Sequence, residues 1–431
     1  MPKIFRRNII MFKKVLSLLL VLVMAASLCV AMASCNKNEN GEDGLSASPL
    51  PEVELKKDFE VDENFKVGFI LLHDEASTYD KNFLDAATRV KETLGLTDEQ
   101  VILKKNVAES NACYEAAADL VDEGCKVIFA NSFGHETHLI KAAKEFTNVQ
   151  FCHATGTMAH TEGLSNYHNA FASIYQGRYL AGVAAGLKLN EMIKDGKITA
   201  DKAKMGYVGA FTYAEVISGY TSFYLGAKSV CPSVTMEVQF TGSWYDEIKE
   251  KEAASALIEN GCVLISQHAD SMGAPSVCEE KGVPNISYNG STFVSCPETF
   301  IVSSKIDWAP YYMYITKCYV NGEDIATDWC GGIKEGSVVL TGINLDVAAE
   351  GTVDAINTAI EGLKAGTIHV FDIEKFTVNN GAKLEKAFAT DTNGDFVNDK
   401  DEAVIDGYYH ESYFQSAPSF AIDIDGITRL N

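Results

Sequence analysis

Short apolar runs alternate with amphipathic segments from Lys66 onwards, and this alternation is the most regular pattern in the chain. The run 66–72 is continuously apolar after Lys66, as in a buried strand, and 81–94 repeats Phe83, Ala87, Val90 and Leu94 at helical spacing. The same pattern predicts strands at 101–105, 127–130, 149–153, 205–210, 235–240, 263–267 and 285–288, and helices at 112–123, 137–146, 179–189, 216–230, 247–260 and 274–281. This order indicates an α/β fold with parallel sheets covered by helices on both faces.

The strands form two series on either side of a polar stretch at 190–204. We therefore predict two doubly wound parallel-sheet lobes, one at 61–173 with parts of 301–345, and one at 174–300 with parts of 346–431. Three later segments could form the crossings between the lobes: apolar runs at 300–304 and 338–342, and a helix at 353–365. We expect the chain to cross near 174–204 and near 298–308.

The N-terminal segment 1–34 is typical of a secretory signal peptide. It has five basic residues, no acidic residue and an apolar run at 15–30. Met32-Ala33-Ser34-Cys35 resembles a bacterial lipobox, in which Cys35 becomes the lipidated first residue of the mature protein. A plain cleaved signal peptide, or an uncleaved helix, is the alternative, and Met11 is an alternative start.

The segment 35–60 that follows is rich in Asn, Glu, Ser and Pro without apolar periodicity, so we expect a flexible tether. The protein is then expected to be exported and held by lipid on the outer face of the cytoplasmic membrane, or in the periplasm.

Composition narrows the classes of partner. The 431 residues contain 36 basic and 59 acidic side chains, a formal charge of -23, and loss of 1–34 would remove basic residues only. Such acidity disfavours nucleic acid, because affinity for phosphate backbones depends on Lys and Arg. Of eleven cysteines, nine would remain beyond Cys35, and the sequence leaves their pairing open.

Catalytic signatures are absent from the sequence. It contains no G-x-S-x-G, Walker A, G-x-G-x-x-G or H-E-x-x-H motif, so we expect neither an enzyme nor a bound cofactor. His135 and His138 have spacing that could suit a metal, but helix capping and solvent exposure explain them more simply.

A second metal candidate is an acidic loop at 391–402. Asp391, Asn393, Asp395, Asp399 and Glu402 occupy positions 1, 3, 5, 9 and 12 of an EF-hand-type loop. Phe396 stands where the loop requires glycine, so a solvated acidic loop is the simpler interpretation.

Polar and aromatic residues gather just after the predicted strands, where open parallel sheets bind ligands. Phe83, Phe133 and Trp244 follow strand ends and could sandwich a planar ring, although ordinary packing explains each one equally well. Asp270 and Lys305 could engage ligand hydroxyls, with salt bridges as the alternative.

Four motifs in these segments make the chain resemble the basic membrane protein family of bacterial substrate-binding lipoproteins. They are Tyr79-Asp80-Lys81-Asn82-Phe83, Tyr175-Gln176-Gly177-Arg178-Tyr179-Leu180-Ala181-Gly182, Gly242-Ser243-Trp244-Tyr245-Asp246 and Gln267-His268-Ala269-Asp270-Ser271. The resemblance implies a type I periplasmic binding protein fold, in which two lobes on a hinge close over one ligand. It also implies a purine nucleoside or a related planar compound as ligand, and an ABC permease as partner.

The resemblance also implies roles for individual residues. Phe83 and Trp244 would stack on the base, and Lys305 would reach the ribose. The other positions at the ligand would be Asp80, Asn82, Ser132, Phe133, Gly134, Asp270 and Asn289.

Two departures from the family pattern leave the ligand open. Tyr288-Asn289 replaces a Gly-x-Asp motif, and Trp244 replaces a phenylalanine. A free purine base or a flavin is therefore an alternative ligand, and a sensory lipoprotein of the same fold is an alternative role.

Overall fold

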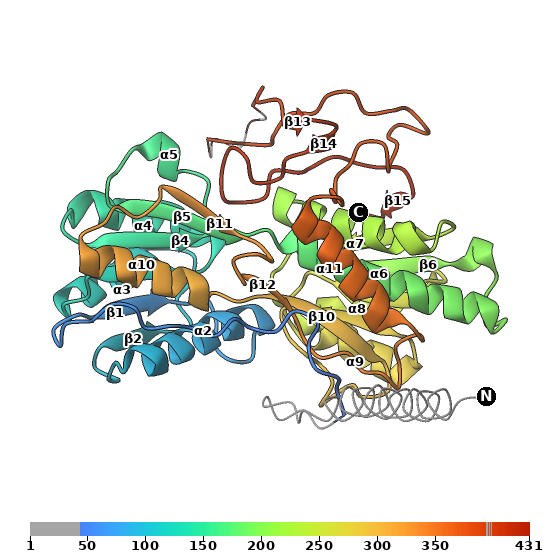
Figure 1. Cartoon of the computed structure of the whole chain (residues 1–431), viewed down its shortest axis with the longest axis horizontal. Helices are drawn as coiled ribbons and strands as arrows, with labels where there is room; N and C mark the ends of the chain where they lie inside the picture. The colour runs from blue at the N-terminus through green and yellow to red at the C-terminus, as the bar shows by residue number, and fades with distance from the viewer. Residues whose placement is uncertain (1–43, 394, 396, 398) are drawn as a thin grey trace, which may run out of the picture. The chain divides into compact units, whose positions relative to one another are not determined.

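The fold is built on two large β-sheets, one in each lobe (Figure 1). The first sheet has the strand order β11-β5-β4-β3-β1-β2. The computed structural model describes residues 44–393, 395, 397 and 399–431, and in it every neighbouring pair of this sheet is parallel. The strands are β1 (Val67–Ile70), β2 (Val101–Lys104), β3 (Val127–Ala130), β4 (Gln150–Ala154), β5 (Tyr167–Ala172) and β11 (Asp328–Gly331). The helices of this lobe are α2 (Thr78–Leu94), α3 (Asn111–Asp122), α4 (Glu136–Glu145), α5 (Ala159–Glu162) and α10 (Ala309–Asn321), with a 3-10 turn at Phe133–His135.

The second sheet has the order β12-β10-β9-β8-β6-β7-β15 and is parallel except for the edge strand β12. Its strands are β6 (Lys204–Gly209), β7 (Thr235–Phe240), β8 (Leu264–Gln267), β9 (Asn285–Tyr288), β10 (Phe300–Ile306), β12 (Val338–Leu340) and β15 (Ile427–Arg429). Its helices are α6 (Ile174–Lys194), α7 (Ala214–Val230), α8 (Glu247–Glu259), α9 (Gly273–Lys281) and α11 (Thr352–Ala365), with a 3-10 turn at Ala200–Lys202. A small hairpin of β13 (Val404–Ile405) and β14 (Tyr408–Tyr409) belongs to neither sheet.

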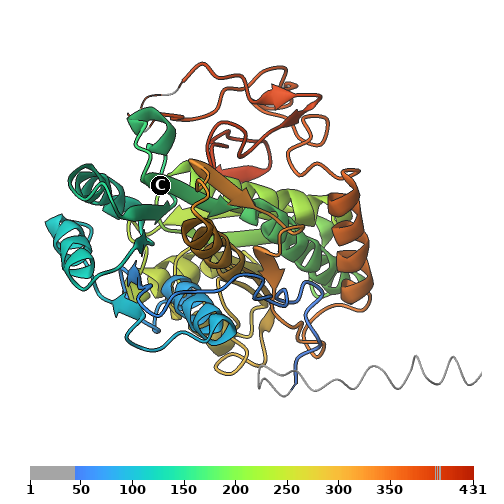
Figure 2. The same cartoon turned by 60° about the vertical axis from the view of Figure 1, so that its left-hand side comes forward.

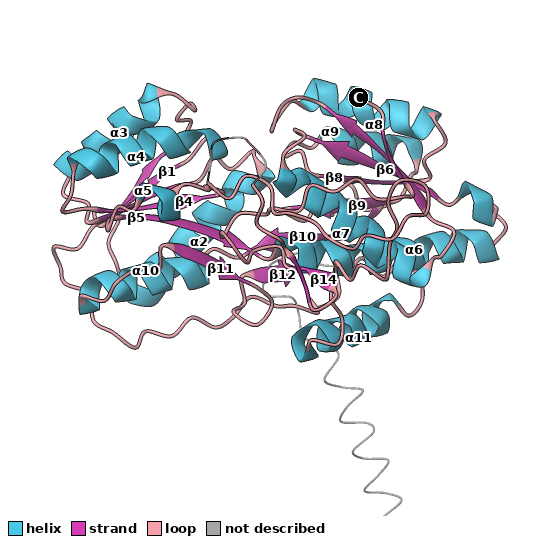
Figure 3. Ribbon diagram, turned by 90° about the horizontal axis from the view of Figure 1, so that it is seen from above, coloured by secondary structure: helices cyan, strands magenta, loops and turns pink. Residues whose placement is uncertain are grey.

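Helices cover both faces of each sheet. Figure 3 shows α3 and α4 opposite α2 and α10 on the first sheet, and α8 and α9 opposite α6 and α7 on the second. The apolar strands are buried on both faces, as in β1 and β3, where all four residues are buried. The prediction of two doubly wound lobes is confirmed.

The elements that sequence periodicity missed have polar residues within them or lie at the edges of the sheets. β5 has His168 and Asn169 in its middle, although all six of its residues are buried. α10 starts with Pro310 in its first turn. β11 is short and half-buried, and β15 pairs with β7 from far along the chain. Pairing across such distances leaves little local signal in the sequence.

Within the described residues, the chain passes from one sheet to the other three times. It leaves β5 for α6 at Ser173, returns from β10 to α10 at 307–308, and passes from β11 to β12 at 332–337. The first passage lies just ahead of the range expected from sequence, because α6 belongs entirely with the second lobe, where it packs on α7.

The segment from Ser48 to Glu60, expected to be part of the flexible tether, packs on the rest of the protein. Leu50 and Phe59 are buried. The Glu52 carboxylate lies 2.5 Å from Lys305 Nζ and 2.8 Å from Arg89 Nη1. This part of the expected tether is therefore folded, while the predicted signal peptide, Cys35 and most of the remaining tether lie outside the described residues.

All nine cysteines in the described part of the chain are free thiols, and eight of them are buried. None of the described helices has the length and hydrophobicity that crossing a membrane requires.

The contact between α6 and α7 depends on glycine. A Cβ atom at Gly182 would lie 2.0 Å from the Phe223 carbonyl oxygen, and one at Gly226 would lie 2.0 Å from the Tyr179 carbonyl oxygen. These distances are far below van der Waals contact, so the two backbones approach as closely as they do only because both positions lack a side chain. The contact aligns α6, the first element after Ser173, with the second lobe.

We expect Gly182→Ala to lower the free energy of unfolding by roughly 1–3 kcal/mol, since the added methyl group must push two backbones apart. Urea denaturation followed by circular dichroism measures the change. Lys194→Ala, at the exposed end of the same helix, is the control and should have little effect. Equal midpoints for Gly182→Ala and wild type would contradict the proposed close packing.

Candidate functional site

A pocket lies where the carboxyl ends of the strands of both sheets meet. We call it the central pocket. It is lined by Leu72, His73, Tyr79, Asp80, Ser132, Phe133, Thr155, Glu215, Trp244, His268, Asp270, Tyr288 and Asn289. Both lobes contribute aromatic rings and polar groups, which is the composition of a small-molecule site.

The wall formed by the first lobe is organised around Asp80. Ser77 caps α2 by accepting a hydrogen bond from Asp80 N, so Tyr79 and Asp80 fall in the first turn of the helix. Asp80 Oδ1 accepts hydrogen bonds from His73 N at 3.0 Å and Asn131 Nδ2 at 2.7 Å, and His73 Nδ1 lies 3.4 Å from Oδ2. Burial acts to raise the pKa of Asp80, but these hydrogen bonds outweigh it and lower the pKa below its usual value. Asp80 is therefore an ionised acceptor.

The wall formed by the second lobe contains a carboxyl group, that of Asp270, whose pKa is shifted in the opposite direction to that of Asp80. Asp270 Oδ1 accepts a hydrogen bond from Asn289 Nδ2 at 3.1 Å, and Asp270 N donates to the Trp244 carbonyl at 2.9 Å. Complete burial raises the pKa of Asp270 well above its usual value, and the charges of Asp80 and Glu250 raise it further. The pKa values of Asp80 and Asp270, the two carboxyl groups that face each other here, are therefore shifted in opposite directions.

A buried arginine supports the floor of the pocket from behind. Arg178 donates to Ser266 Oγ at 2.8 Å and to Tyr207 OH at 3.2 Å, and its guanidinium lies 4.9 Å from the ring centroid of Tyr288. Hydroxyl groups, backbone carbonyls and aromatic faces thus stabilise its charge. This explains the buried Arg in the second motif found in the sequence.

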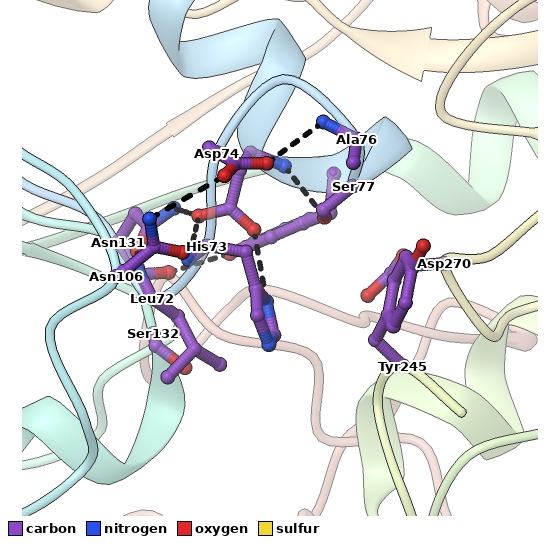
Figure 4. A network of polar contacts seen from close by, with 12 residues as sticks. Leu72, His73, Asp74, Ala76, Ser77, Asn106, Asn131, Ser132, Tyr245 and Asp270 are labelled. Carbon is purple, nitrogen blue, oxygen red and sulfur yellow. Dashed lines mark hydrogen bonds and ion pairs between the residues drawn. The ribbon is translucent and has the colours of Figure 1, made fainter. Parts of the chain in front are cut away.

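The two lobes touch across the pocket, so the structure is closed. Thr78 donates from its N and Oγ1 to the Asp270 carbonyl at 3.3 and 3.1 Å. Phe133 stacks on Tyr213 with centroids 5.1 Å apart, and His73 lies opposite Tyr245 (Figure 4). The cavity left between them is about 20 Å³, which is room for little more than one water molecule. Entry of a ligand requires the lobes or the lining rings to move apart.

Two strand ends at the pocket have left-handed backbone. Thr155 has φ 68° and Asn289 has φ 64°. Asparagine tolerates this conformation, but a β-branched threonine rarely adopts it, and such strain concentrates at functional sites. The Asn289 Oδ1 and Thr155 Oγ1 atoms are buried without a hydrogen-bond partner among the described residues.

Six of the expected site residues line the pocket: Asp80, Ser132, Phe133, Trp244, Asp270 and Asn289. Phe83 does not. Its side chain is 1 % exposed, stacks on Trp308 at 4.6 Å and lies beneath Tyr79 at 4.8 Å. Tyr79 therefore lines the pocket from α2, where the sequence predicted Phe83 to do so.

Three further expected residues also lie away from the lining. Lys305 pairs with Glu52, as described above, rather than with groups in the pocket. The Gly134 N–H donates to Glu109 Oε1 at 2.8 Å, and Asn82 is buried within α2. The described contacts of Lys305, Gly134 and Asn82 are therefore with other parts of the protein and not with the central pocket.

Seven further residues line the pocket without an individual role predicted from the sequence: Leu72, His73, Tyr79, Thr155, Glu215, His268 and Tyr288. Thr155 and His268 directly follow a strand, and Tyr288 ends one. Leu72 and His73 come shortly after β1, and Tyr79 and Glu215 lie in the first turn of the next helix. All seven therefore lie at the edge of the sheets where the sequence predicts the site.

The metal candidates do not assemble into a site. His135 is buried, not exposed as expected, and burial lowers its pKa to about 4. In the acidic loop, the Asp399 carboxylate accepts hydrogen bonds from Thr392 and Asn393, and Glu402 pairs with Lys386. No group of three or more metal-ligating side chains occurs among the described residues, which exclude 394, 396 and 398.

Comparison with known proteins identifies the family. Residues 71–372 match the model of the family described as ABC transporter substrate-binding protein PnrA-like. This chain belongs to that family. Its members are solute-binding proteins rather than enzymes, so the chain is an ABC transporter substrate-binding protein whose ligand is a small molecule.

The individual relatives differ in the ligand that their names give. The chain is 34% identical to a purine-binding protein of Brucella abortus over 64% of this chain and 75% of that protein. It is also 31% identical to a putative ABC transporter glucose-binding protein of Haloferax volcanii, over 50% of this chain and 51% of that protein. A solved solute-binding protein from Conexibacter woesei has a TM-score of 0.56 at 20% identity, over 71% of this chain and 98% of that chain, which supports the type I fold.

Behind Asp270, a further buried carboxyl group supports the site of this substrate-binding protein. Glu250 Oε1 accepts hydrogen bonds from Asp246 N at 3.2 Å and Ser271 N at 3.3 Å, linking α8 to the loop that contains Asp270. Burial raises the pKa of Glu250 to about 7, from an ordinary value of 4.5.

Between pH 4.5 and 7 the folded protein keeps the Glu250 proton that the unfolded chain releases. The contribution of Glu250 to the free energy of unfolding therefore decreases as pH rises through this window. We expect Glu250→Gln, which cannot ionise, to show a smaller loss of stability between pH 5 and 8 than wild type in urea denaturation. Glu252→Gln, exposed on the same helix, should keep the wild-type pH dependence, and an unchanged slope in Glu250→Gln would contradict the assignment.

Proposed function

We propose that this protein captures a purine nucleoside or a related planar compound between its lobes and delivers it to an ABC importer. The supporting observation is the combination of Trp244 with the hydrogen-bonded pair Asp270 and Asn289 in one pocket. An aromatic face binds a flat ring, and a carboxyl group and an amide can form hydrogen bonds with polar atoms at the edge of that ring.

The rings on both sides of the pocket support a flat ligand. Tyr79 and Phe133 come from the first lobe, and Trp244 and Tyr288 from the second. A purine held between rings from opposite lobes would stabilise the closed form, which is how a ligand shifts a two-lobed protein toward closure. The purine-binding relative agrees with this chemistry.

Charge supports a ligand without phosphate. The described lining of the central pocket includes Asp80, Glu215 and Asp270 and contains no Lys or Arg. An anionic ligand would have to enter a pocket that offers it no cationic partner.

Trp244→Ala should weaken purine binding at least tenfold, because one face of the base loses its stacking partner. Isothermal titration calorimetry with adenosine, guanosine, inosine and hypoxanthine measures this, with riboflavin and glucose as competing candidates. Trp244→Phe should retain much of the affinity, and Trp329→Phe, at a tryptophan outside the pocket, should match wild type.

Wild-type protein that binds none of the purines would overturn the proposal. Binding of glucose alone would favour the chemistry named for the Haloferax relative.

We also propose that the protein is a lipoprotein whose Cys35 carries the anchor, on the basis of Met32-Ala33-Ser34-Cys35 after an apolar run. Cys35→Ser should move the protein from the membrane fraction to the soluble fraction of the expressing bacterium. It should also abolish incorporation of radiolabelled palmitate, while Cys29→Ser should not. Continued palmitate labelling of Cys35→Ser would exclude Cys35 as the modified residue.

A further inference from the structure

A second compartment adjoins the central pocket and has a volume of about 170 Å³. We call it the outer compartment. It shares Phe133, Thr155 and Glu215 with the central pocket. A ligand whose ring lies in the central pocket could therefore extend a substituent into the outer compartment without leaving the protein.

One wall of the outer compartment comes from the C-terminal segment, which lies beyond the family match at 71–372. Its contributing residues are Thr390, Asp391, Gln415, Ala417, Pro418 and Ala421. Figures 1 and 2 draw this segment in orange to red as a largely irregular coil. The family match therefore says nothing about the function of this wall.

Hydrogen bonds to both lobes fix the position of this wall. Ser416 donates from its N and Oγ to Asp328 Oδ1 of β11 in the first lobe, both at 2.9 Å. Further along, β15 pairs with β7 of the second lobe. Gln415 directly precedes Ser416, so the backbone at Gln415 is held close to the first lobe.

Two polar atoms at the outer compartment lack a protein partner. Gln415 is 3% exposed and Thr155 is 4% exposed, and neither Gln415 Oε1 nor Thr155 Oγ1 has a hydrogen-bond partner among the described residues. Leaving a buried polar atom unpaired costs about 1–3 kcal/mol. A ligand hydroxyl group, which both donates and accepts, would satisfy either atom.

The charges at the outer compartment restrict the substituent. Glu215 and Asp391 line it, and no Lys or Arg is among its described lining residues. Phosphate would be repelled there, whereas a neutral group with several hydroxyls would not.

We infer that the C-terminal segment forms a subsite for a neutral, hydroxyl-bearing substituent of the ligand. This inference rests on the proposed purine chemistry of the central pocket. Gln415 is the specificity-determining residue of the subsite. The ring binds in the central pocket, and a pentose binds in the outer compartment. The protein thereby distinguishes a nucleoside from the free base and from the nucleotide.

Calorimetry of the full mature chain with inosine, hypoxanthine and inosine monophosphate tests the inference. Wild type should bind inosine more tightly than hypoxanthine and should bind the monophosphate at least tenfold more weakly than inosine. Gln415→Ala should weaken inosine binding about tenfold and leave hypoxanthine binding unchanged, because only inosine reaches the outer compartment.

Two further variants guard against a general loss of structure. Ala421→Leu, at a partly exposed lining position, should fill the compartment and reduce inosine but not hypoxanthine affinity. Tyr413→Ala, exposed in the same segment, should match wild type.

Equal losses for inosine and hypoxanthine, or no loss for either, in Gln415→Ala and Ala421→Leu would overturn the subsite while leaving the proposed function intact. Absence of binding by all three purines to wild type would instead overturn the proposed function.

Discussion

The closed site depends on two buried carboxyl groups that face the same pocket from opposite lobes. Two like charges at such a place would repel each other with little water to screen them. Against the effect of burial, hydrogen bonds from His73 and Asn131 lower the pKa of Asp80, whereas complete burial and the charge of Asp80 raise the pKa of Asp270. These opposite shifts reduce the repulsion between the Asp80 and Asp270 carboxyl groups when the lobes close.

This arrangement requires each lobe to hold its carboxyl group rigidly. In the first lobe, the Ser77 cap fixes the first turn of α2, and Asn131 ties Asp80 to the end of β3. In the second, Arg178 reaches from α6 under the ends of β8 and β9, and the close contact of α6 with α7 keeps α6 in place. Backbone contact at Gly182 is thus connected, through Arg178 and Tyr288, to the floor of the pocket.

The C-terminal segment adds a constraint that the two lobes alone do not provide. Because it is bonded to β11 in one lobe and paired with β7 in the other, it lies across the side of the site where the outer compartment opens. When the lobes open, this segment must therefore change its conformation or move with one of the lobes. Ligand entry thus depends on a region outside the family match.

The two α/β lobes and the edge at which the site lies were predictable from local patterns, because buried parallel strands and amphipathic helices leave a periodic signal that depends only on neighbouring residues. The positions of Trp244 and Asp270 after predicted strands also pointed to the site, since residues after parallel strands gather at one edge, and the family resemblance added Asn289. Other outcomes were not predictable in this way: Phe83 is part of the core while Tyr79 reaches the pocket, Lys305 pairs with Glu52, and Gln415 lines a second compartment. Those outcomes depend on side-chain direction and on contacts between segments hundreds of residues apart, which no local pattern encodes.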